Sequence, residues 1–524
     1  MQPSKLSAAS ESYHTWSVRK PQVESYDGVI STQHYEASRV GCEILARGGN
    51  AMDAAIAAAF ALSVVEPWLS GLGGGGFLLF ANSDGEVASL DFGVRAAAGI
   101  QSCDYIVVEG NDGDWFNWPR VKNNNNLIGP KSICVPGTVH GLSAALQRYG
   151  SLRWDEVIAP TIELAARGMR IDWFAELAIA NDRDGLSKNT AAASAFLNQS
   201  RWERSPEFPN SYFLRLPQNL TFLERLAKAG ADDFYEGEIA HKMLKSLHQD
   251  GSRLTKNDLR GYQSEWHAPL SVQYKDREVY AMSQLSGGPT LLAALASLGR
   301  VDLSAAGEPE ITLAYANALM AADRLRLETM GHAAGKDSCT SHVSVVDRKG
   351  NMVALTNTLL SRFGSKVMVP DLGILLNNGM MWFDPRRDRP NSIAPGEKPL
   401  ANMSPVIALR GKKPEIALGA AGGRKIVPAV AQILSYLVDL NYTPEEAMHA
   451  PRIDTSSDTL LMNRAFSAET LQSIAQHHKT QIVEDTLLPV NFAVPSLVTS
   501  GCGNGKNIGA AHPNSPWAAA MAES

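Results

Sequence analysis

Thr340 is the first residue of a run rich in β-branched side chains, and the segment before it has no regular pattern of apolar residues. Residues 340–346 are rich in such residues, a short glycine-containing loop follows at 347–351, and a second β-branched run occupies 352–358. The pattern predicts a β-hairpin whose first strand begins at Thr340. Residues 331–339 have no apolar period, which predicts an exposed connector that ends at this threonine.

A threonine in this position is suited to one particular chemistry. Its hydroxyl is a poor nucleophile at neutral pH unless a base lies beside it, and a threonine at a chain start carries that base in its own α-amino group. The reference pKa of an α-amine is about 7.7–8.0, so part of it is deprotonated at working pH. Cleavage of the Cys339–Thr340 bond would create nucleophile and base together. A strand threonine read alone, however, is far more often a structural residue.

Several motifs around and beyond this threonine resemble the small-subunit motifs of the γ-glutamyltranspeptidases, in the same order and at similar spacing. They are residues 340–351, Gly373–Asn378, Met403–Pro405 and Ala421–Arg424, and the glycine-rich segment Glu66–Phe80 matches the other half of the family. The resemblance implies an N-terminal nucleophile hydrolase of the α+β class, with a four-layer αββα sandwich. It also implies autocleavage into a large subunit, 1–339, and a small subunit, 340–524, that together form one αββα unit.

The same resemblance assigns catalytic roles. Thr340 is the expected nucleophile, with cleavage between Cys339 and Thr340, and Thr358 is the second threonine whose hydroxyl supports it. Gly422 and Gly423 are expected to supply the N–H groups of the oxyanion hole, where each such donor is typically worth about 3–4 kcal/mol. An ordinary turn is the plainer interpretation of the two glycines. No cofactor and no metal are expected.

The segment Ala88–Ala96 departs from the family pattern. Where the transpeptidases have an arginine that binds the donor's carboxylate, this chain has Gly93, and Arg95 follows two residues later. In a strand, an offset of two keeps a side chain on the same face, displaced by about 6–7 Å. Arg95 is therefore predicted to bind a substrate carboxylate, with an ordinary surface arginine as the equal alternative.

Other donor-binding positions of the family are also changed. Leu360 stands in place of an asparagine, Gly379 and Trp382 replace residues that hold the donor's ammonium, and Ala401-Asn402 replaces a serine pair. An ammonium left unpaired beside Trp382 and Leu360 would cost a few kcal/mol or more. The recognition of a zwitterion is therefore expected to be lost, and Arg95, Asn402 and Trp382 are the predicted substrate-binding residues.

These changes predict an amidohydrolase that cleaves a small amide through an ester on Thr340. The segments Glu66–Gly76 and Asp91–Arg95 resemble a subgroup that includes oxamate amidohydrolase, which implies hydrolysis of oxamate to oxalate and ammonia in purine catabolism. A γ-glutamyltransferase or glutathione hydrolase and a cephalosporin-type acylase stay open as alternatives. The non-enzymatic alternative is a binding protein that stays uncleaved.

Composition and charge limit the classes of binding partner and the cellular location that we expect. The chain has 524 residues, a net charge of −6 and 44% hydrophobic residues, which gives no reason to expect nucleic acid or an anionic membrane as partner. Five scattered cysteines without a CxxC pair argue against a disulfide framework and a zinc site. Residues 1–21 lack an apolar signal segment, which predicts a cytoplasmic location. A higher oligomer is left open.

The first hundred residues predict an amphipathic helix followed by a buried one. Glu36–Arg47 is an amphipathic helix, Asn50 is the expected N-cap of the next helix, and the apolar run Ala54–Val65 is too short to span a bilayer of about 30 Å. The glycine cluster within 71–76 lacks the Lys-Ser/Thr of a phosphate loop and leads into an apolar strand.

Later in the chain, His140 is expected to pack against its neighbours or cap a helix rather than to act as a base. Residues 464–500 predict a helix and then a strand, with no role assigned.

Overall fold

The structure is a computed structural model of the chain, and it describes residues 18–111, 119–204, 208–209, 211–331, 338–487, 490–502 and 505–523. Most of the connector predicted before Thr340 falls in 332–337, outside the described residues.

Two seven-stranded antiparallel sheets form the centre of the molecule. In sheet 1 the strand order is β10 (Glu265–His267), β4 (Val87–Phe92), β3 (Gly75–Ala81), β14 (Met352–Ser361), β13 (Ser338–Val346), β2 (Val29–Thr32) and β24 (Ala519–Ala522). In sheet 2 it is β1 (Val23–Ser25), β23 (Lys506–Ala511), β22 (Val494–Cys502), β18 (Lys413–Ala421), β17 (Val406–Arg410), β12 (Arg277–Ala281) and β11 (Leu270–Tyr274).

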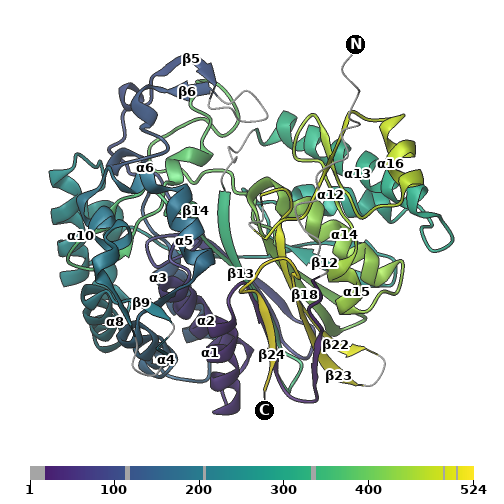
Figure 1. The fold of residues 1–524 in the computed structure, drawn as a ribbon, viewed down its shortest axis with the longest axis horizontal. Helices are drawn as coiled ribbons and strands as arrows, with labels where there is room; N and C mark the ends of the chain where they lie inside the picture. The colour runs from purple at the N-terminus through teal and green to yellow at the C-terminus, as the bar shows by residue number, and fades with distance from the viewer. Residues whose placement is uncertain are drawn as a thin grey trace, which may run out of the picture.

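The sheets pack face to face, with β13 and β14 against β18 and β22 of the other sheet. Helices α2 (Ala51–Val65) and α3 (Thr138–Tyr149) pack on sheet 1, and α1 (Tyr35–Ala46) and α4 (Trp154–Arg167) pack on α2. Helices α12 (Gly288–Leu298), α14 (Ile426–Val438) and α15 (Pro444–His449) cover sheet 2, with α13 (Glu308–Thr329) against α12. Figure 1 shows the resulting order of layers, helices–sheet–sheet–helices, which confirms the predicted αββα sandwich.

Strands from both sides of the predicted cleavage site are interleaved in both sheets. In sheet 1, β13 and β14 lie between β2 and β3, which come from the first hundred residues. In sheet 2, β12 precedes residue 339 and pairs with β17 of the second half. The two parts therefore share one core, as expected for a single αββα unit, while the division at 339/340 itself stays a prediction.

The helices predicted in the first hundred residues are present. Asn50 caps α2: its side chain accepts from the N–H groups of Met52 and Asp53, and the Asp53 carboxylate accepts the N–H of Asn50 in return, completing a capping box. Alanine-rich α2 is almost entirely buried between its neighbours, because small side chains allow the helix to approach both sheet 1 and α1. No helix among the described residues is long and apolar enough to cross a membrane.

The predicted hairpin forms, but its first strand starts earlier than expected. Strand β13 begins at Ser338 rather than at Thr340, and its register with β14 shifts between Cys339 and Ser341. The pairing of Ser338 and Cys339 with the end of β14 extends the strand through the predicted cleavage site. The peptide bond before Thr340 therefore lies inside a sheet, at a local irregularity.

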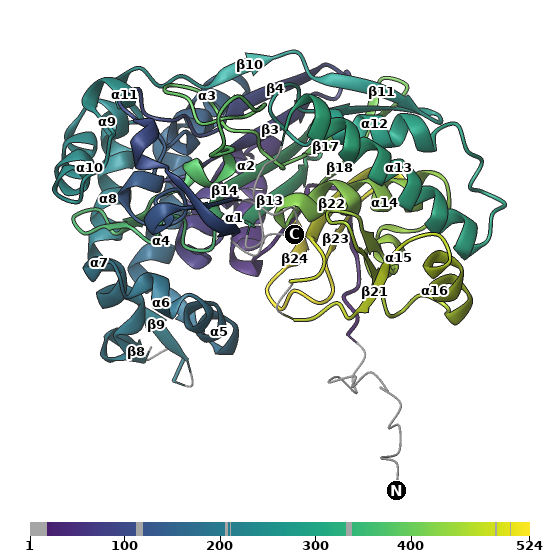
Figure 2. The ribbon, with the colours of Figure 1, turned by 90° about the horizontal axis from the view of Figure 1, so that it is seen from above.

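The remaining elements surround this core, and one group forms a lobe seen apart from the sandwich in Figure 2. The lobe contains β7 (Met169–Ile171), α5 (Trp173–Asn181), α6 (Arg183–Leu186), α7 (Thr190–Ala192), η4 (Ala193–Leu197), η5 (Gln199–Arg201), β8 (Trp202–Arg204) and β9 (Tyr212–Leu214). Helices α8 (Pro217–Ala229), α9 (Asp232–Tyr235), α10 (Glu238–Gln249) and α11 (Lys256–Arg260) follow the lobe in the sequence.

The remaining elements are short. They are η1 (Ser102–Asp104), β5 (Val107–Asn111), β6 (Pro119–Val121), η2 (Lys122–Asn124), η3 (Pro130–Ser132), β15 (Met368–Val369), β16 (Ile374–Leu375), η6 (Gly379–Trp382), η7 (Gly423–Lys425), β19 (Ile453–Asp454) and β20 (Leu460–Asn463). The predicted helix and strand in 464–500 are α16 (Ala468–Ala475) and β21 (Thr480–Val483).

Candidate active site

Thr340 and Thr358 face each other across the β13–β14 pair. Both side chains are buried, with about 1% of each residue exposed. The Thr340 hydroxyl donates to Thr358 Oγ1 at 3.5 Å, and the Thr358 hydroxyl donates to the carbonyl oxygen of Cys339. Thr358 Oγ1 also accepts the N–H of Leu360 at 2.8 Å. The structure thus brings together the predicted nucleophile, its supporting threonine and the scissile carbonyl.

This arrangement is suited to self-cleavage. A hydrogen bond to the Cys339 carbonyl draws electron density from its carbon and stabilises the oxyanion that forms when a nucleophile attacks. If Thr340 Oγ1 adds to that carbon, the hydroxyl proton passes to the amide nitrogen, the C–N bond breaks and an ester links the two halves. Water then cleaves the ester and leaves Thr340 with a free α-amino group. Thr358 is therefore placed to act on the Cys339–Thr340 bond before any cleavage there.

Gly422 lies in the same cavity as the predicted nucleophile. The Thr340 cavity is lined by Gln33, Glu66, Trp68, Leu69, Phe174, Ala178, Cys339, Thr340, Arg362, Ala421, Gly422, Val494 and Ser515. Gly422 has φ +144° and Gly423 has φ +58°, conformations that glycine adopts readily and side-chain-bearing residues rarely do. A Cβ on Gly422 would come within 2.8 Å of Ala493. The two glycines turn the chain sharply at the end of β18, and Gly422 lines the Thr340 cavity, while their role as an oxyanion hole stays a prediction.

Two titratable side chains of the Thr340 cavity were given no role by the sequence. Glu66 is buried, and burial raises the pKa of its carboxyl well above the usual range, against the smaller opposing effect of the Ser341 hydroxyl 3.5 Å away. Arg362 Nε donates to Asp182 Oδ2 at 2.6 Å, which ties the cavity wall to the lobe. Their approach to Thr340 depends on long-range packing, which no local sequence signal carries.

A second cavity adjoins Thr358 from another side. This Thr358 cavity is lined by Gly75, Phe77, Asp91, Gly93, Val94, Leu285, Thr358, Leu360, Trp382, Lys398, Pro399, Ala401 and Met403. It contains Gly93, Leu360, Trp382 and Ala401, four of the six positions at which the chain departs from the family's donor-binding residues, while Gly379 and Asn402 do not line it. The structure therefore gathers most of those substitutions in one place, next to Thr358.

Of the three predicted substrate-binding residues, Trp382 lies in this cavity. It is 2% exposed, and its Nε1 has no hydrogen-bond partner among the described residues. Asn402 does not line the cavity: its Oδ1 accepts from Arg326 at 2.9 Å, and it faces a separate cavity with Asp323 and Arg424. Because neighbouring residues of an extended segment point to opposite sides, Ala401 faces the Thr358 cavity and Asn402 faces away from it.

The argument that Arg95 continues a strand and lies on the same face as Gly93 is wrong. Strand β4 ends at Phe92, and Arg95 lies beyond it in an isolated bridge with Val135. Its guanidinium donates to Glu265 Oε1 at 2.8 Å and to the carbonyl of Gly396 at 3.3 Å. Arg95 is not among the lining residues of the Thr358 cavity, so its carboxylate-binding role stays a prediction without support from this geometry.

Lys398 is the cation that the Thr358 cavity does contain, and sequence reasoning missed it. Its Nζ lies 3.0 Å from Asp91 Oδ2 and 3.3 Å from Glu265 Oε1. The separation of more than 300 residues from Asp91 leaves no local signal. Only the assembled sheet and the loop after Ser392 bring the two together.

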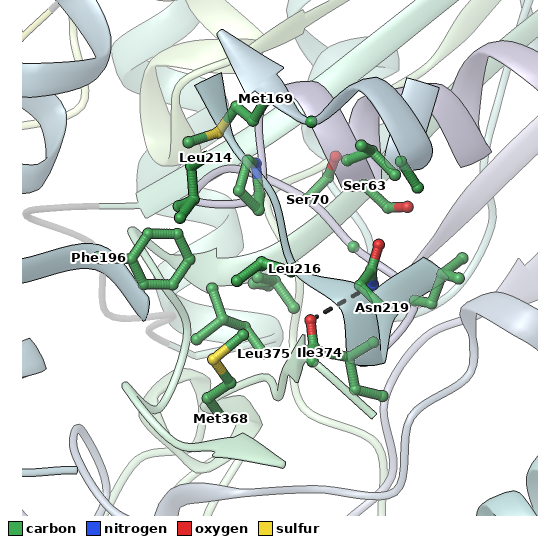
Figure 3. Close-up of a pocket in the computed structure, with 18 residues that line it drawn as sticks. Ser63, Ser70, Met169, Phe196, Leu214, Leu216, Asn219, Met368, Ile374 and Leu375 are labelled. Carbon is green, nitrogen blue, oxygen red and sulfur yellow. Dashed lines mark hydrogen bonds between the residues drawn. The ribbon is translucent and has the colours of Figure 1, made fainter. Parts of the chain in front are cut away.

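A third cavity lies on the other side of Leu359 and is drawn in Figure 3. Its wall is mainly apolar, with Met169, Phe196, Leu214 and Leu375 pointing inward, and Asn219 donates to the carbonyl of Gly373 at 3.3 Å. Neither Thr340 nor Thr358 lines it. It supplies no chemistry for the reaction.

Other chemistries find no support in the described part of the chain. No group of three or more His, Cys, Asp or Glu side chains there is placed to hold a metal ion. Within the same residues Cys42, Cys103, Cys134 and Cys339 form no disulfide. His140 lies in α3, with Nδ1 2.8 Å from Ser264 Oγ, and lines neither the Thr340 nor the Thr358 cavity.

Comparison with known proteins agrees with this geometry. The sequence model of the γ-glutamyltranspeptidases matches residues 37–333 and 320–494. The acylase ACY 1 proenzyme of Pseudomonas sp. (strain SE83) is 30% identical over 495 residues, covering 86% of this chain and 87% of the acylase. The glutathione hydrolase proenzyme of Escherichia coli (strain K12) is 28% identical over 512 residues, covering 86% and 85%. Among solved structures, a cephalosporin acylase from Bacillus halodurans has the same fold, with a TM-score of 0.83, 22% identity and coverage of 97% and 98%.

Proposed function

Because the chain belongs to the γ-glutamyltranspeptidase family, we propose that it is a self-cleaving amidohydrolase that acts on a small anionic amide such as oxamate. After cleavage before Thr340, its freed α-amino group takes the proton of its own hydroxyl, and Oγ1 attacks the amide carbonyl carbon. The N–H groups of Gly422 and Gly423 stabilise the oxyanion. The leaving amine takes up the proton and departs, and water hydrolyses the ester to release the acid and restore the threonine.

The observation that carries the substrate proposal is the lining of the Thr358 cavity. Leu360 and Trp382 present apolar surface, while Gly93 and Ala401 contribute no polar side-chain group. The ammonium of a zwitterionic γ-glutamyl group would find there only the Asp91 carboxylate, which Lys398 already neutralises, and would be poorly paired at a cost of a few kcal/mol. A short acyl group with a single negative charge needs fewer polar partners from the residues that line this cavity.

The relatives support the reaction class more than the substrate. Both compared sequences are proenzymes, one named an acylase and the other a glutathione hydrolase. An acylase is the second candidate, supported by the 30% identity to the Pseudomonas protein and by the apolar wall around Trp382. In either case, cleavage between 339 and 340 would leave two subunits held together by the interleaved sheets. Purine catabolism and a cytoplasmic location stay predictions from the sequence.

Substrate competition tests the proposal. Purified protein is assayed for ammonia release from oxamate and from glutamine, and for cleavage of a γ-glutamyl anilide and of a glutaryl amide. The proposal expects oxamate to give the highest kcat/KM. Preference for the γ-glutamyl anilide would establish the glutathione-hydrolase alternative, and preference for the glutaryl amide the acylase. An uncleaved chain that hydrolyses none of the four would favour the binding protein.

A further inference from the structure

Lys398 is a largely buried cation whose neighbours use only part of its hydrogen-bonding capacity. Its side chain is 12% exposed, and Nζ lies 3.0 Å from Asp91 Oδ2 and 3.3 Å from Glu265 Oε1, so two carboxylates face its three N–H groups. An ammonium has three N–H donors, and burying it without acceptors is costly. The two carboxylates therefore neutralise the charge of the ammonium, while an N–H donor of Lys398 is left for a ligand.

The two neighbouring carboxylates are already engaged elsewhere. Asp91 Oδ1 accepts the N–H of Gly93 at 2.7 Å, and Glu265 Oε1 accepts from Arg95 at 2.8 Å. Two acids and two bases make this group neutral overall. It holds the Lys398 ammonium at the cavity wall, and two carboxylate oxygens cannot occupy all three of its N–H groups.

A second unpaired donor lies in the same cavity. Trp382 Nε1 is buried and has no partner among the described residues, and Trp382, Lys398 and Thr358 line one cavity. Gly93, at which the family arginine is missing, leaves the space in front of Asp91 open: a Cβ there would meet only Asp91 Oδ1 at 3.0 Å and Phe77 at 3.9 Å. Two donors, one of them charged, on an otherwise largely apolar wall match the acceptor oxygens of a carboxylate.

We propose that Lys398 binds the carboxylate of the substrate, with Trp382 Nε1 as the second donor, and so selects amides whose acyl group carries a negative charge. This inference rests on the proposed function and names the residue that sets its substrate class. In this proposal the substrate carboxylate is bound by Lys398, a lysine on a different loop, and neither by the family arginine that this chain lacks nor by Arg95.

Oxamate and oxamide form the matched substrate pair, because they differ only in a carboxylate against an uncharged amide. Lys398→Met removes the charge and keeps the length of the side chain. It is expected to lower kcat/KM for oxamate by about 10–100-fold, mostly through KM, since a hydrogen bond to a charged group is lost. The value for oxamide should change less than about threefold, because uncharged substrate makes no ion pair. Lys398→Arg should restore most of the oxamate activity, and Lys412→Met, an exposed lysine, is the control for charge loss.

Equal losses on oxamate and oxamide, or no loss on either, would overturn the proposal. If Lys398→Met fails to fold, as judged by its self-cleavage, Trp382→Phe provides the second test and should lower the oxamate/oxamide ratio alone. Oxalate binding by calorimetry separates the two claims. Wild-type binding that Lys398→Met abolishes supports the lysine site even without turnover of oxamate. Oxamate turnover with unchanged oxalate binding in Lys398→Met supports the function and rejects the site.

Discussion

At the scale of single residues, Thr358 is the side chain that hydrogen-bonds to both groups of the proposed self-cleavage. Its hydroxyl donates to the Cys339 carbonyl and accepts from Thr340 at 3.5 Å, so it contacts both the predicted cleavage site and the predicted nucleophile. The same hydroxyl accepts the N–H of Leu360, whose φ of +83° is unusual for a leucine. The backbone conformation at Leu360 therefore aims an N–H at Thr358 and holds the hydroxyl in place.

Thr358→Val keeps the shape of the side chain and removes the donor. We expect self-cleavage to slow by about 10²–10³-fold, as for the removal of one oxyanion donor. The measurement is the fraction of cleaved chain against time, by denaturing gel. Thr358→Ser retains the hydroxyl and should cleave at a rate within about tenfold of wild type, since only a methyl group is lost. Cleavage of Thr358→Val at the wild-type rate would remove Thr358 from the account.

The sequence predicted the residues that belong to motifs and missed those defined by the fold. Thr340, Thr358 and Gly422 keep their motif positions, and the structure places all three at the site. Lys398 is absent from that prediction because its neighbours, Asp91 and Glu265, come from distant segments. Arg95 was misplaced because β4 ends at Phe92, and strand ends are set by pairing partners that a local pattern does not contain.

At the scale of elements, the two sheets touch most closely where β13 crosses β18. His342 is buried between them, with Nδ1 2.8 Å from Thr356 Oγ1 and Nε2 3.0 Å from Ser344 Oγ. A Cβ on Gly419 would lie 2.2 Å from the imidazole ring. Glycine at 419 is therefore required by the ring across the sheet interface, and His342 lies two residues after Thr340 in β13.

Gly419→Ala should destabilise the fold by about 1–3 kcal/mol or more, because the added methyl group overlaps the ring. The measurement is the unfolding midpoint in urea, made on the uncleaved Thr340→Ala background so that every sample is one chain. A double-mutant cycle with His342→Ser supplies the control, since the methyl group should cost less once the ring is gone. Equal costs with and without the ring would contradict the packing argument.

The local patterns explain why individual elements were predictable and their order was not. The Asn50 cap of α2 and the two β-branched runs within 340–358 are short-range signals, and both the helix start and the hairpin were confirmed. By contrast, β24 pairs with β2 from the opposite end of the chain, and β1 pairs with β23. Such pairings follow from which buried faces fit together, and the sequence pattern alone favours no particular partner.

At the scale of the whole molecule, two buried neutral histidines make the fold sensitive to acid. Burial lowers the pKa of both His34 and His342 to about 3, from an ordinary 6.5. His34 Nδ1 accepts the N–H of Glu36 as the N-cap of α1, which requires an unprotonated nitrogen. Below pH 6.5 the unfolded chain takes up protons that the folded chain refuses, so stability is complete above 6.5 and falls toward pH 3.

His34→Asn tests this dependence, because asparagine also caps helices but does not titrate. Between pH 6 and pH 4 the variant should lose stability less steeply than its parent, by up to about 1.4 kcal/mol per pH unit for the one histidine removed. Tm is measured across this range on the uncleaved Thr340→Ala background. Parallel pH profiles would show that His34 does not contribute, and a steeper profile in the variant would reverse the assigned sign.

The central claim is that Thr340 cuts the chain in front of itself and then serves as the nucleophile. The measurement that tests it most directly is the intact mass of the purified wild type and of Thr340→Ala after incubation at neutral pH. The account predicts two fragments in the wild type, divided between Cys339 and Thr340, and a single 56.5 kDa chain, less one side-chain change, in the variant. One uncut chain in both samples, or cleavage at the same bond in both, would contradict it.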